Sequence, residues 1–348
     1  MATRRVRLVC ISDTHNQTPK LPSGDILIHA GDFSNQGTFS ELQKTIRWLQ
    51  QTQCRTKILV CGNHDITCDV PFYAQHGGRF HNKKIEDPQR CIDLFYSDPT
   101  FIYLNHEAKD VRIDFDDDTH ALLKVFGSPY SPAKGFWAFG YDPETASQLW
   151  SQIPLGADLV ITHAPAKGHR DRCSTRDTAG CDKLLAALSQ VRPKIFVCGH
   201  IHEGYGVEIV TWDLSSSIGQ SKENSVRQLE DQAPESKKLF VVDLSSRSRD
   251  TALQNDCSIG QIDPESEIDS TSDINSEIGR RGKAQTCIVN AAFMASNWPH
   301  KDGKAFHKPV VIDIDLPILQ NPVPPTDTTP ESSSNKQADR SDIRLLDG

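Results

Sequence analysis

Aspartate, asparagine and histidine residues recur in this sequence directly after short apolar runs. The first such run, VRLVCIS, is followed by Asp13 and His15, and the run KILVCG is followed by Asn63 and His64. Carboxylate oxygens, amide oxygens and imidazole nitrogens are the ligands that Mn, Fe, Zn or Mg ions take in proteins. The residues placed in this way are Asp13, His15, Asp32, Asn63, His64, His163, His200 and His202.

The apolar runs before these residues are typical of buried strands in an α/β protein, since they are short and rich in Val, Ile and Leu. Open α/β sheets bind their ligands at the carboxyl ends of the strands. Five strands would therefore bring metal-binding side chains to the same edge of a sheet. Seven candidate ligands exceed what one ion takes, whereas two ions that share one carboxylate would use all of them.

The strands and helices that must position these residues can be predicted from periodicity. We expect strands over 7–11, 26–29, 57–61, 121–126, 159–162, 194–198, 284–292 and 309–316. Helices are expected over 40–52, 143–153 and 181–191. The first helix would begin with a capping box of Ser40 and Gln43. This alternation of strands and helices predicts an α/β fold with the metal site at the carboxyl ends of the strands.

The composition changes along the 348 residues and indicates one domain with two polar appendages. Residues 1–213 and 284–317 would form the single domain. Residues 214–283 are rich in Ser, Asp, Glu and Gln, and we expect a mostly disordered, low-complexity insertion there. Within it, KLFVVDL at 238–244 fits a strand or a docking segment. Residues 318–348 are predicted to be a disordered tail.

Charge and hydropathy exclude several classes of protein. The net charge of −8 disfavours an extended nucleic-acid surface, which is usually basic. No apolar run reaches the length of about 20 residues that a membrane helix needs. The ten cysteines contain no CxxC pair, and several lie in strand-like runs, so we expect buried thiols in a reducing compartment and a cytoplasmic location. Protein partners are left open.

The motifs SDTHNQ, LIHAGDFSNQG, VCGNHD, ITHAPAKG and CGHIHEGYG, in this order, resemble the calcineurin-like metallophosphoesterase superfamily. With GSPYSPAKGFWAFG and AGCDKLL, the chain is more narrowly similar to its metallophosphoesterase-domain-containing, cyclic-nucleotide phosphodiesterase-like branch. The resemblance covers residues 5–212 and 284–317. It implies a metallophosphoesterase fold of two packed mixed β-sheets flanked by helices.

The resemblance also implies a role for each candidate ligand. Two divalent ions (Mn, Fe, Zn or Mg, with Mn expected to support turnover in vitro) would be shared between two sets of residues. The first ion would be held by Asp13, His15, Asp32 and His202, and the second by Asp32, Asn63, His163 and His200. His64 would contact the phosphate and protonate the leaving alkoxide, with Asn63 also on the substrate side. GNHD stands where many relatives have GNHE.

A dinuclear site of this kind suits phosphoester hydrolysis, because two cations bind the phosphoryl oxygens and generate a bridging hydroxide near neutral pH. We predict a phosphodiesterase for a small or cyclic-nucleotide-like substrate. A phosphomonoesterase for a small metabolite and a weakly active nucleotide-binding or scaffold protein are the alternatives. Protein phosphatases of the superfamily carry GDxVDRG, whose arginine is absent from GDFSNQG.

Several other residues have two possible roles. Ser128, Pro129, Tyr130 and Trp137 either line a base or leaving-group pocket or pack a loop. His169, in HAPAKGHRD, either approaches the substrate phosphate or is a surface histidine. We expect His29 in the core, and we expect the three aspartates at 116–118 in a solvated hairpin turn.

Overall fold

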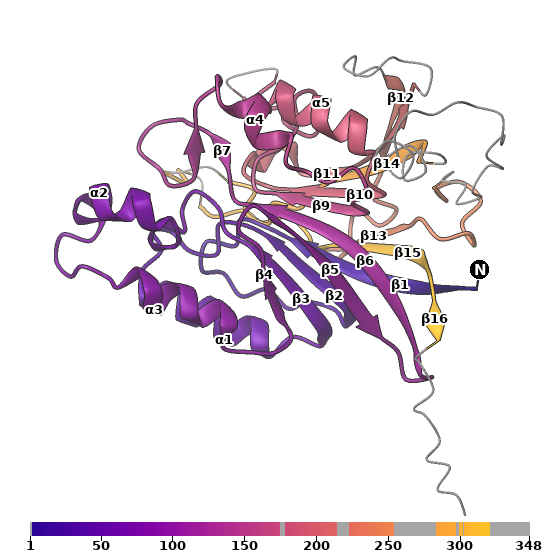
Figure 1. Cartoon of the computed structure of the whole chain (residues 1–348), viewed down its shortest axis with the longest axis horizontal. Coiled ribbons are helices and arrows are strands. Elements are labelled where there is room, and N and C mark those ends of the chain that lie inside the picture. The colour runs from indigo at the N-terminus through magenta and orange to yellow at the C-terminus, as the bar shows by residue number, and fades with distance from the viewer. Residues whose placement is uncertain are drawn as a thin grey trace, which may run out of the picture.

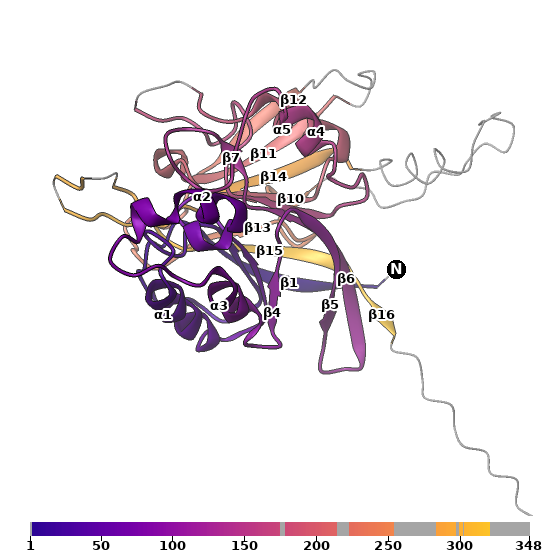
Figure 2. The same cartoon turned by 60° about the vertical axis from the view of Figure 1, so that its left-hand side comes forward.

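The computed structural model describes residues 2–174, 178–213, 223–253, 283–296, 299–301 and 303–320. Two β-sheets pack face to face, and helices cover the outer face of each (Figure 1). The view in Figure 2 shows α1 and α3 on one side of the sheets and α4 and α5 on the other. The predicted α/β fold with two mixed, packed sheets is therefore confirmed.

The first sheet has six strands in the order β13-β15-β1-β2-β3-β4. Its strands β1 to β4 run parallel, whereas β15 is antiparallel to β1 and β13 is parallel to β15. The bounds are β1 (Thr3–Ile11), β2 (Gly24–Ala30), β3 (Cys54–Val60), β4 (Phe101–Tyr103), β13 (Phe240–Asp243) and β15 (Val310–Pro317).

The second sheet has the order β12-β11-β14-β10-β9-β6-β16, and β5 pairs with β6. Strands β14, β10, β9 and β6 run parallel, so β9 and β10 end at the same edge. The bounds are β5 (Glu107–Asp114), β6 (Thr119–Ser128), β9 (Leu159–Thr162), β10 (Ile195–Cys198), β11 (Gly206–Trp212), β12 (Glu223–Leu229), β14 (Gln285–Asn290) and β16 (Leu319–Gln320). Strands β7 (Ser131–Pro132) and β8 (Gly140–Tyr141) form a separate pair.

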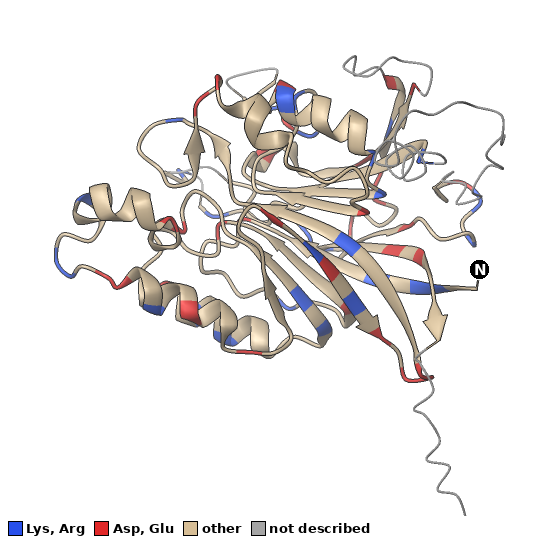
Figure 3. Cartoon of the chain, in the orientation of Figure 1, with Lys and Arg blue, Asp and Glu red and all other residues tan. Residues whose placement is uncertain are grey.

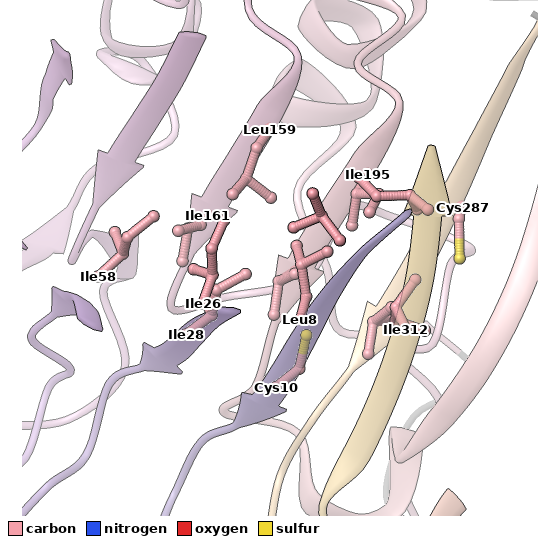
Figure 4. Close-up of a cluster of buried hydrophobic side chains, with 14 of the residues drawn as sticks. Leu8, Cys10, Ile26, Ile28, Ile58, Leu159, Ile161, Ile195, Cys287 and Ile312 are labelled. Atoms are coloured by element: carbon pink, nitrogen blue, oxygen red, sulfur yellow. The ribbon is translucent and has the colours of Figure 1, made fainter. Parts of the chain in front are cut away.

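Alternate residues of each strand face different layers, as the twofold period of a strand requires. Leu8 and Cys10 point into the core between the two sheets, where they meet Ile161 and Ile195 of the second sheet (Figure 4). Val9, on the opposite face of β1, packs in the layer under the helices. Both faces of the central strands are buried, which explains why their sequences are almost continuously apolar.

The helices use their apolar faces to cover the sheets. Leu42, Ile46 and Leu49 of α1 (Phe39–Gln50) pack on the first sheet, and Leu184 and Leu188 of α5 pack on the second. The other helices are α2 (Val70–Phe80), α3 (Pro88–Asp93), α4 (Ala146–Trp150) and α5 (Asp182–Val191), with 3-10 turns η1 (Ile66–Cys68), η2 (Leu94–Tyr96) and η3 (His202–Gly204). Among the helices of the described residues, none has both the length and the apolar character that a bilayer span requires.

The predicted capping box of α1, Ser40 with Gln43, was wrong. The N-cap is Thr38, whose Oγ1 accepts from the Glu41 backbone N at 3.2 Å, while the Glu41 carboxylate accepts from the Thr38 N at 3.1 Å. A Thr-x-x-Glu pair therefore starts the helix one residue before Ser40. The charged partner at the third helical position also suits the positive end of the helix dipole.

The region expected to be a disordered insertion contains ordered strands where the structure describes it. β12 pairs antiparallel with β11, and β13, inside KLFVVDL, extends the first sheet beside β15. Residues 214–222 and 254–282 of the insertion lie outside the described residues, as does the predicted tail from 321 on. Residues 319–320 of that tail form β16.

The aspartates at 116–118 form the exposed turn between β5 and β6, as expected. Asp116 accepts two hydrogen bonds from Arg55, and Asp117 pairs with Arg4 at 2.7 Å. Acidic and basic residues alternate along β5 (Figure 3), so the strand is a mixed-charge surface.

Burial of β13 predicts that this strand stabilises the domain. Phe240 is 3% exposed in the core between the sheets, whereas Val241 on the other face is 45% exposed. Phe240→Ala is expected to lower the free energy of unfolding by about 3 kcal/mol. Val241→Ala, the control in the same strand, should change it by about 0.5 kcal/mol or less. Urea denaturation measures both; equal small effects would show that β13 does not pack as described.

Candidate metal centre

The metal-binding residues lie where the strands end. Asp13 and His15 follow β1, Asp32 follows β2, and Asn63 and His64 follow β3, all in the first sheet. His163 follows β9 of the second sheet, and His200 and His202 follow β10. The structure brings all eight predicted residues to one place, at the edge where the two sheets meet.

One group of ligand atoms belongs to Asp13, His15 and His202. An atom from each lies within 4.8 Å of the others. The His202 Nε2 is 3.5 Å from the Asp13 Oδ1. This group is the one expected to hold the first ion together with Asp32.

A second group surrounds the Nε2 of His163. That nitrogen is 2.9 Å from the Asn63 Oδ1 and 3.2 Å from the His200 Nδ1. The Asp32 Oδ2 lies 3.4 Å away. The His163 Nδ1 faces the Ala30 carbonyl at 2.9 Å and donates to it, which leaves Nε2 as the nitrogen that could bind a metal ion. Four electron-rich atoms thus converge, and this donor set fits a divalent cation.

Asp32 lies between the two groups. Its Oδ2 is 3.7 Å from the His15 Nε2 as well as 3.4 Å from the His163 Nε2. The backbone N of His64 donates to its Oδ1 at 2.8 Å, which fixes the carboxylate. Asp32 is therefore positioned to be shared by two ions.

The backbone at several of the ligands adopts conformations that residues other than glycine rarely take. Asp13, Asp32 and His200 have φ of 51°, 56° and 64°, in the left-handed region. Gly31 has φ of 107°, and a Cβ there would lie 2.3 Å from the His163 Nδ1. Glycine at this position lets the chain pass directly behind a ligand.

Burial and charge set the protonation of the ligands. Burial lowers the pKa of His15 to about 4 and that of His200 to about 3, so both imidazoles are neutral, as ligation requires. Burial opposes the charge of Asp32, but the neighbouring His163 and His64 hold its pKa well below the usual value. Burial likewise lowers the pKa of His163, yet the adjacent Asp32 outweighs it and raises that pKa to about 9. At neutral pH the His163 Nε2 therefore carries a proton, which a bound metal ion would displace.

His64 stands beside the ligands without joining either group. Its Nδ1 is 2.7 Å from the Asn35 carbonyl, and its ring centre is 4.9 Å from that of His15. The ring of Trp137 packs against it at 3.9 Å. His64 is partly exposed, and its hydrogen bond to Asn35 leaves Nε2 without a partner among the described residues.

Two cavities open onto the cluster, with volumes of about 500 and 750 Å³. Both are lined by Asn63, His64, Trp137, His200 and His202. The larger is also lined by His15, Asp32, Met294, His300 and Lys304. The last three lie in the segment between β14 and β15. The family resemblance covers this segment, but it implied no site residue there, so sequence reasoning missed them.

Asp65 is a further residue that the sequence did not single out. Its carboxylate accepts from the backbone N of Phe33, Ser34 and Gly62 and from the Ser34 hydroxyl. It therefore ties the loop after β2 to the loop after β3. Burial and the nearby Asp32 raise its pKa to about 7. The last residue of GNHD was the available signal.

His169 does not join the cluster. It is 2% exposed and lines neither of the two cavities. Its Nδ1 is 2.6 Å from Glu208 and its Nε2 is 3.0 Å from Glu223 of β12. Both ring nitrogens thus face carboxylates, so His169 is not a surface histidine and instead links the inserted strand β12 to Glu208 of β11.

Of the residues considered for a leaving-group pocket, Trp137 lines both cavities and the other three do not. Ser128 is fully buried with its hydroxyl 2.9 Å from the His106 Nδ1, and Tyr130 packs in the core layers. His29 is buried as expected, with its Nε2 3.0 Å from the Thr14 hydroxyl, although its Nδ1 has no hydrogen-bond partner in the part of the chain that the structure describes.

The sequence profile described as calcineurin-like phosphoesterase matches residues 6–204. The chain belongs to this family. The matched stretch contains all the candidate ligands of both groups. This metallophosphoesterase is thereby expected to use divalent metal ions, which its family typically binds in pairs.

Curated relatives agree with the narrower resemblance. Metallophosphoesterase domain-containing protein 1 of Homo sapiens is 35% identical over 212 residues, which are 58% of this chain and 62% of that protein. A UPF0046 protein of Caenorhabditis elegans is 33% identical over 208 residues, 58% of this chain and 52% of that protein.

A probable rhamnogalacturonate lyase C of Emericella nidulans is 42% identical over 211 residues, which are 60% of this chain but 18% of that protein. The chain thus spans between about a fifth and two thirds of the lengths of these relatives. Among solved structures, a purple acid phosphatase from yellow lupin seeds aligns with a TM-score of 0.33 and 13% identity, over 69% of this chain and 42% of that one.

Removal of the Asp32 carboxylate, which lies between the two groups, is predicted to weaken metal binding at both. Wild-type protein equilibrated with Mn²⁺ and desalted should retain two ions per chain, and Asp32→Ala fewer than one. His163→Ala, which removes a ligand of one group, should retain about one. His76→Ala, a histidine of α2 outside the cluster, is the control and should retain two. Mass spectrometry of the bound metal measures this; two ions in Asp32→Ala would rule out a shared ligand.

The His169 ion pairs predict a pH-dependent stability. Burial opposes the charge of His169, but the hydrogen bonds to Glu208 and Glu223 raise its pKa to about 9. A raised pKa in the folded state stabilises the protein fully below the unfolded value of about 6.5, and this stabilisation is lost as pH rises through 9. The Tm difference between wild type and His169→Gln should therefore be larger at pH 6 than at pH 10. His76→Gln should show no such trend, and a pH-independent difference for His169→Gln would contradict the pairing.

Proposed function

We propose that this protein is a dinuclear-metal-dependent phosphoester hydrolase that cleaves small phosphodiesters, including cyclic-nucleotide-like ones. The observation that carries the proposal is the position of the Asp32 Oδ2, within 3.7 Å of the His15 Nε2 and 3.4 Å of the His163 Nε2. One carboxylate therefore faces two ligand groups, which is what a pair of adjacent ions requires.

The residues present fit two such ions. Asp13, His15, Asp32 and His202 would hold the first, and Asp32, Asn63, His163 and His200 the second. When bound, two divalent cations bind the phosphoryl oxygens and lower the pKa of a bound water to about 7, which supplies the nucleophile. We infer Mn²⁺ as the metal for turnover in vitro, because the set mixes carboxylate, amide and imidazole ligands.

His64 would supply the proton that the departing alkoxide needs. The Asn35 carbonyl accepts a hydrogen bond from the His64 Nδ1 at 2.7 Å, so Nε2 is the nitrogen that would donate a proton to the leaving group. His64 lines both of the cavities that open onto the cluster, so a substrate bound in either one could reach it. The Trp137 ring, which packs against that of His64, limits the positions the imidazole can adopt and would form the adjoining wall for a leaving group.

The size of the cavities and the cysteines support two further parts of the proposal. Volumes of about 500 and 750 Å³ suit a small molecule. The cysteines of the described residues are all free, and eight of these nine are buried, which supports a reducing, cytoplasmic location.

Activity on model diesters tests the proposal. The wild-type protein with Mn²⁺ should hydrolyse bis(p-nitrophenyl) phosphate faster than p-nitrophenyl phosphate. Asp32→Ala should be inactive. His64→Ala should lose about 100-fold in kcat, and more with a 2′,3′-cyclic nucleotide, because an alkoxide needs the proton more than p-nitrophenolate does. His76→Ala serves as the histidine control and should keep wild-type kcat.

Each alternative has its own outcome. Faster hydrolysis of the monoester would replace the diesterase by the phosphomonoesterase. Protein that holds two Mn²⁺ and turns over neither ester would identify a binding or scaffold protein. Activity that survives in Asp32→Ala would contradict the two-metal mechanism.

A further inference from the structure

A third cavity, of about 840 Å³, adjoins the site on the side of the closing segment. Three stretches that are distant in the sequence line it: 19–22, 237–239 and 304–309, together with Phe293. We call it the lysine groove. Lys304 lines both this groove and the larger cavity over the metal cluster, so the two spaces share a wall residue.

The groove concentrates positive charge. Lys20, Lys237, Lys238 and Lys304 line it and are exposed, and its described lining contains no Asp or Glu. None of these four ammonium groups has a carboxylate within ion-pair distance among the residues that the structure describes. Lys308, by contrast, is paired with Asp231 and donates to the Ala233 carbonyl at 2.7 Å. Four lysines without a described acidic partner, in a chain of net charge −8, mark this surface as a place for an anion.

One wall of the groove is apolar. Phe293 and Phe306 stack with ring centres 5.1 Å apart, and Phe306 is 45% exposed. Leu21 and Leu239 also line the groove. A ligand there can therefore place an apolar or planar part against Phe306 while an anionic group meets the lysines.

We propose that the lysine groove binds a second phosphate group, carried by a substrate whose scissile phosphodiester lies at the metal cluster. This rests on the proposed function and narrows its substrate class to small phosphodiesters that bear a further phosphate. Lys304 would contact such a molecule between its two phosphate groups, because it lines both the lysine groove and the larger cavity over the metal cluster. The inserted segment before β13 supplies Lys237 and Lys238, so the insertion contributes to substrate selection.

A matched pair of substrates separates the groove from the catalytic cluster. The p-nitrophenyl ester of thymidine 5′-phosphate and the same ester with a 3′-phosphate release the same product and differ in the distal phosphate alone. Wild-type protein at low ionic strength should prefer the 3′-phosphorylated ester by at least 10-fold in kcat/KM. Added salt should reduce that preference, because exposed charges are screened.

Charge reversal in the groove should remove the preference. In the double variant Lys237→Glu/Lys238→Glu, kcat/KM for the 3′-phosphorylated ester should fall at least 10-fold, through KM, with kcat and the activity on the simpler ester unchanged. Lys20→Glu should act in the same direction. The control is Lys83→Glu/Lys84→Glu, a second pair of adjacent exposed lysines that lines none of these cavities. It should leave both substrates unaffected.

The result that would refute phosphate binding in the lysine groove differs from the result that would refute the proposed function. Equal kcat/KM for the two esters in wild type, or equal losses in the groove and control variants, would refute the groove while the hydrolase stands. If wild type cleaves neither ester, the proposed function fails, and titration calorimetry with thymidine 3′,5′-bisphosphate decides the groove. Binding that weakens at least 10-fold in Lys237→Glu/Lys238→Glu but not in the control would support it, and equal binding would refute it.

Discussion

The burial of the Asp32 carboxylate is the constraint on which the rest of this structure depends. The residue is 2% exposed, and its Oδ2 lies between His15 of one ligand group and His163 of the other. A buried carboxylate is costly unless cations or hydrogen-bond donors surround it. The backbone N of His64 supplies one donor, and the remaining partners are imidazoles that suit a metal ion. The Asp32 carboxylate therefore links the charge of the site, the packing of the two sheets and the proposed metal chemistry.

The two-sheet architecture follows from that requirement. His15 and Asp32 come from the first sheet, whereas His163 comes from the second, so neither sheet alone completes a group. The apolar core between the sheets, around Leu8 and Ile161, holds the two edges at a fixed separation. Left-handed backbone at Asp13 and Asp32 turns the chain sharply out of the strands, and Asp65 ties two of these loops together. Core packing thus stabilises a strained set of loops that could not hold this geometry by themselves.

The inserted region illustrates how composition can conceal structure. Its sequence is mostly polar and of low complexity, but the apolar run KLFVVDL, which fitted a strand, forms β13 at the edge of the first sheet and buries Phe240 in the core between the sheets. The strand β12 exposes most of its residues and is attached through Glu223, which reaches the buried His169. A few well-placed contacts with an existing core are enough to order a polar segment, because the core supplies the apolar partner that the segment lacks.

The sequence by itself determined the strands that end at the site, the residues at their ends and the chemistry of those residues, but not strands β4, β5, β11 and β12 or the order of strands in either sheet. That information is local, because a short apolar run followed by Asp or His specifies both a buried strand and what it delivers. The sequence could not show that His169 contacts Glu208 and Glu223, or that Lys304 and Met294 line the larger cavity over the metal cluster. Tertiary structure decided these, because each depends on which distant segment lies opposite: Glu223 across from His169, or the segment between β14 and β15 beside the lysines of the insertion. Contacts between segments so far apart in the sequence leave no periodic spacing from which they could be predicted.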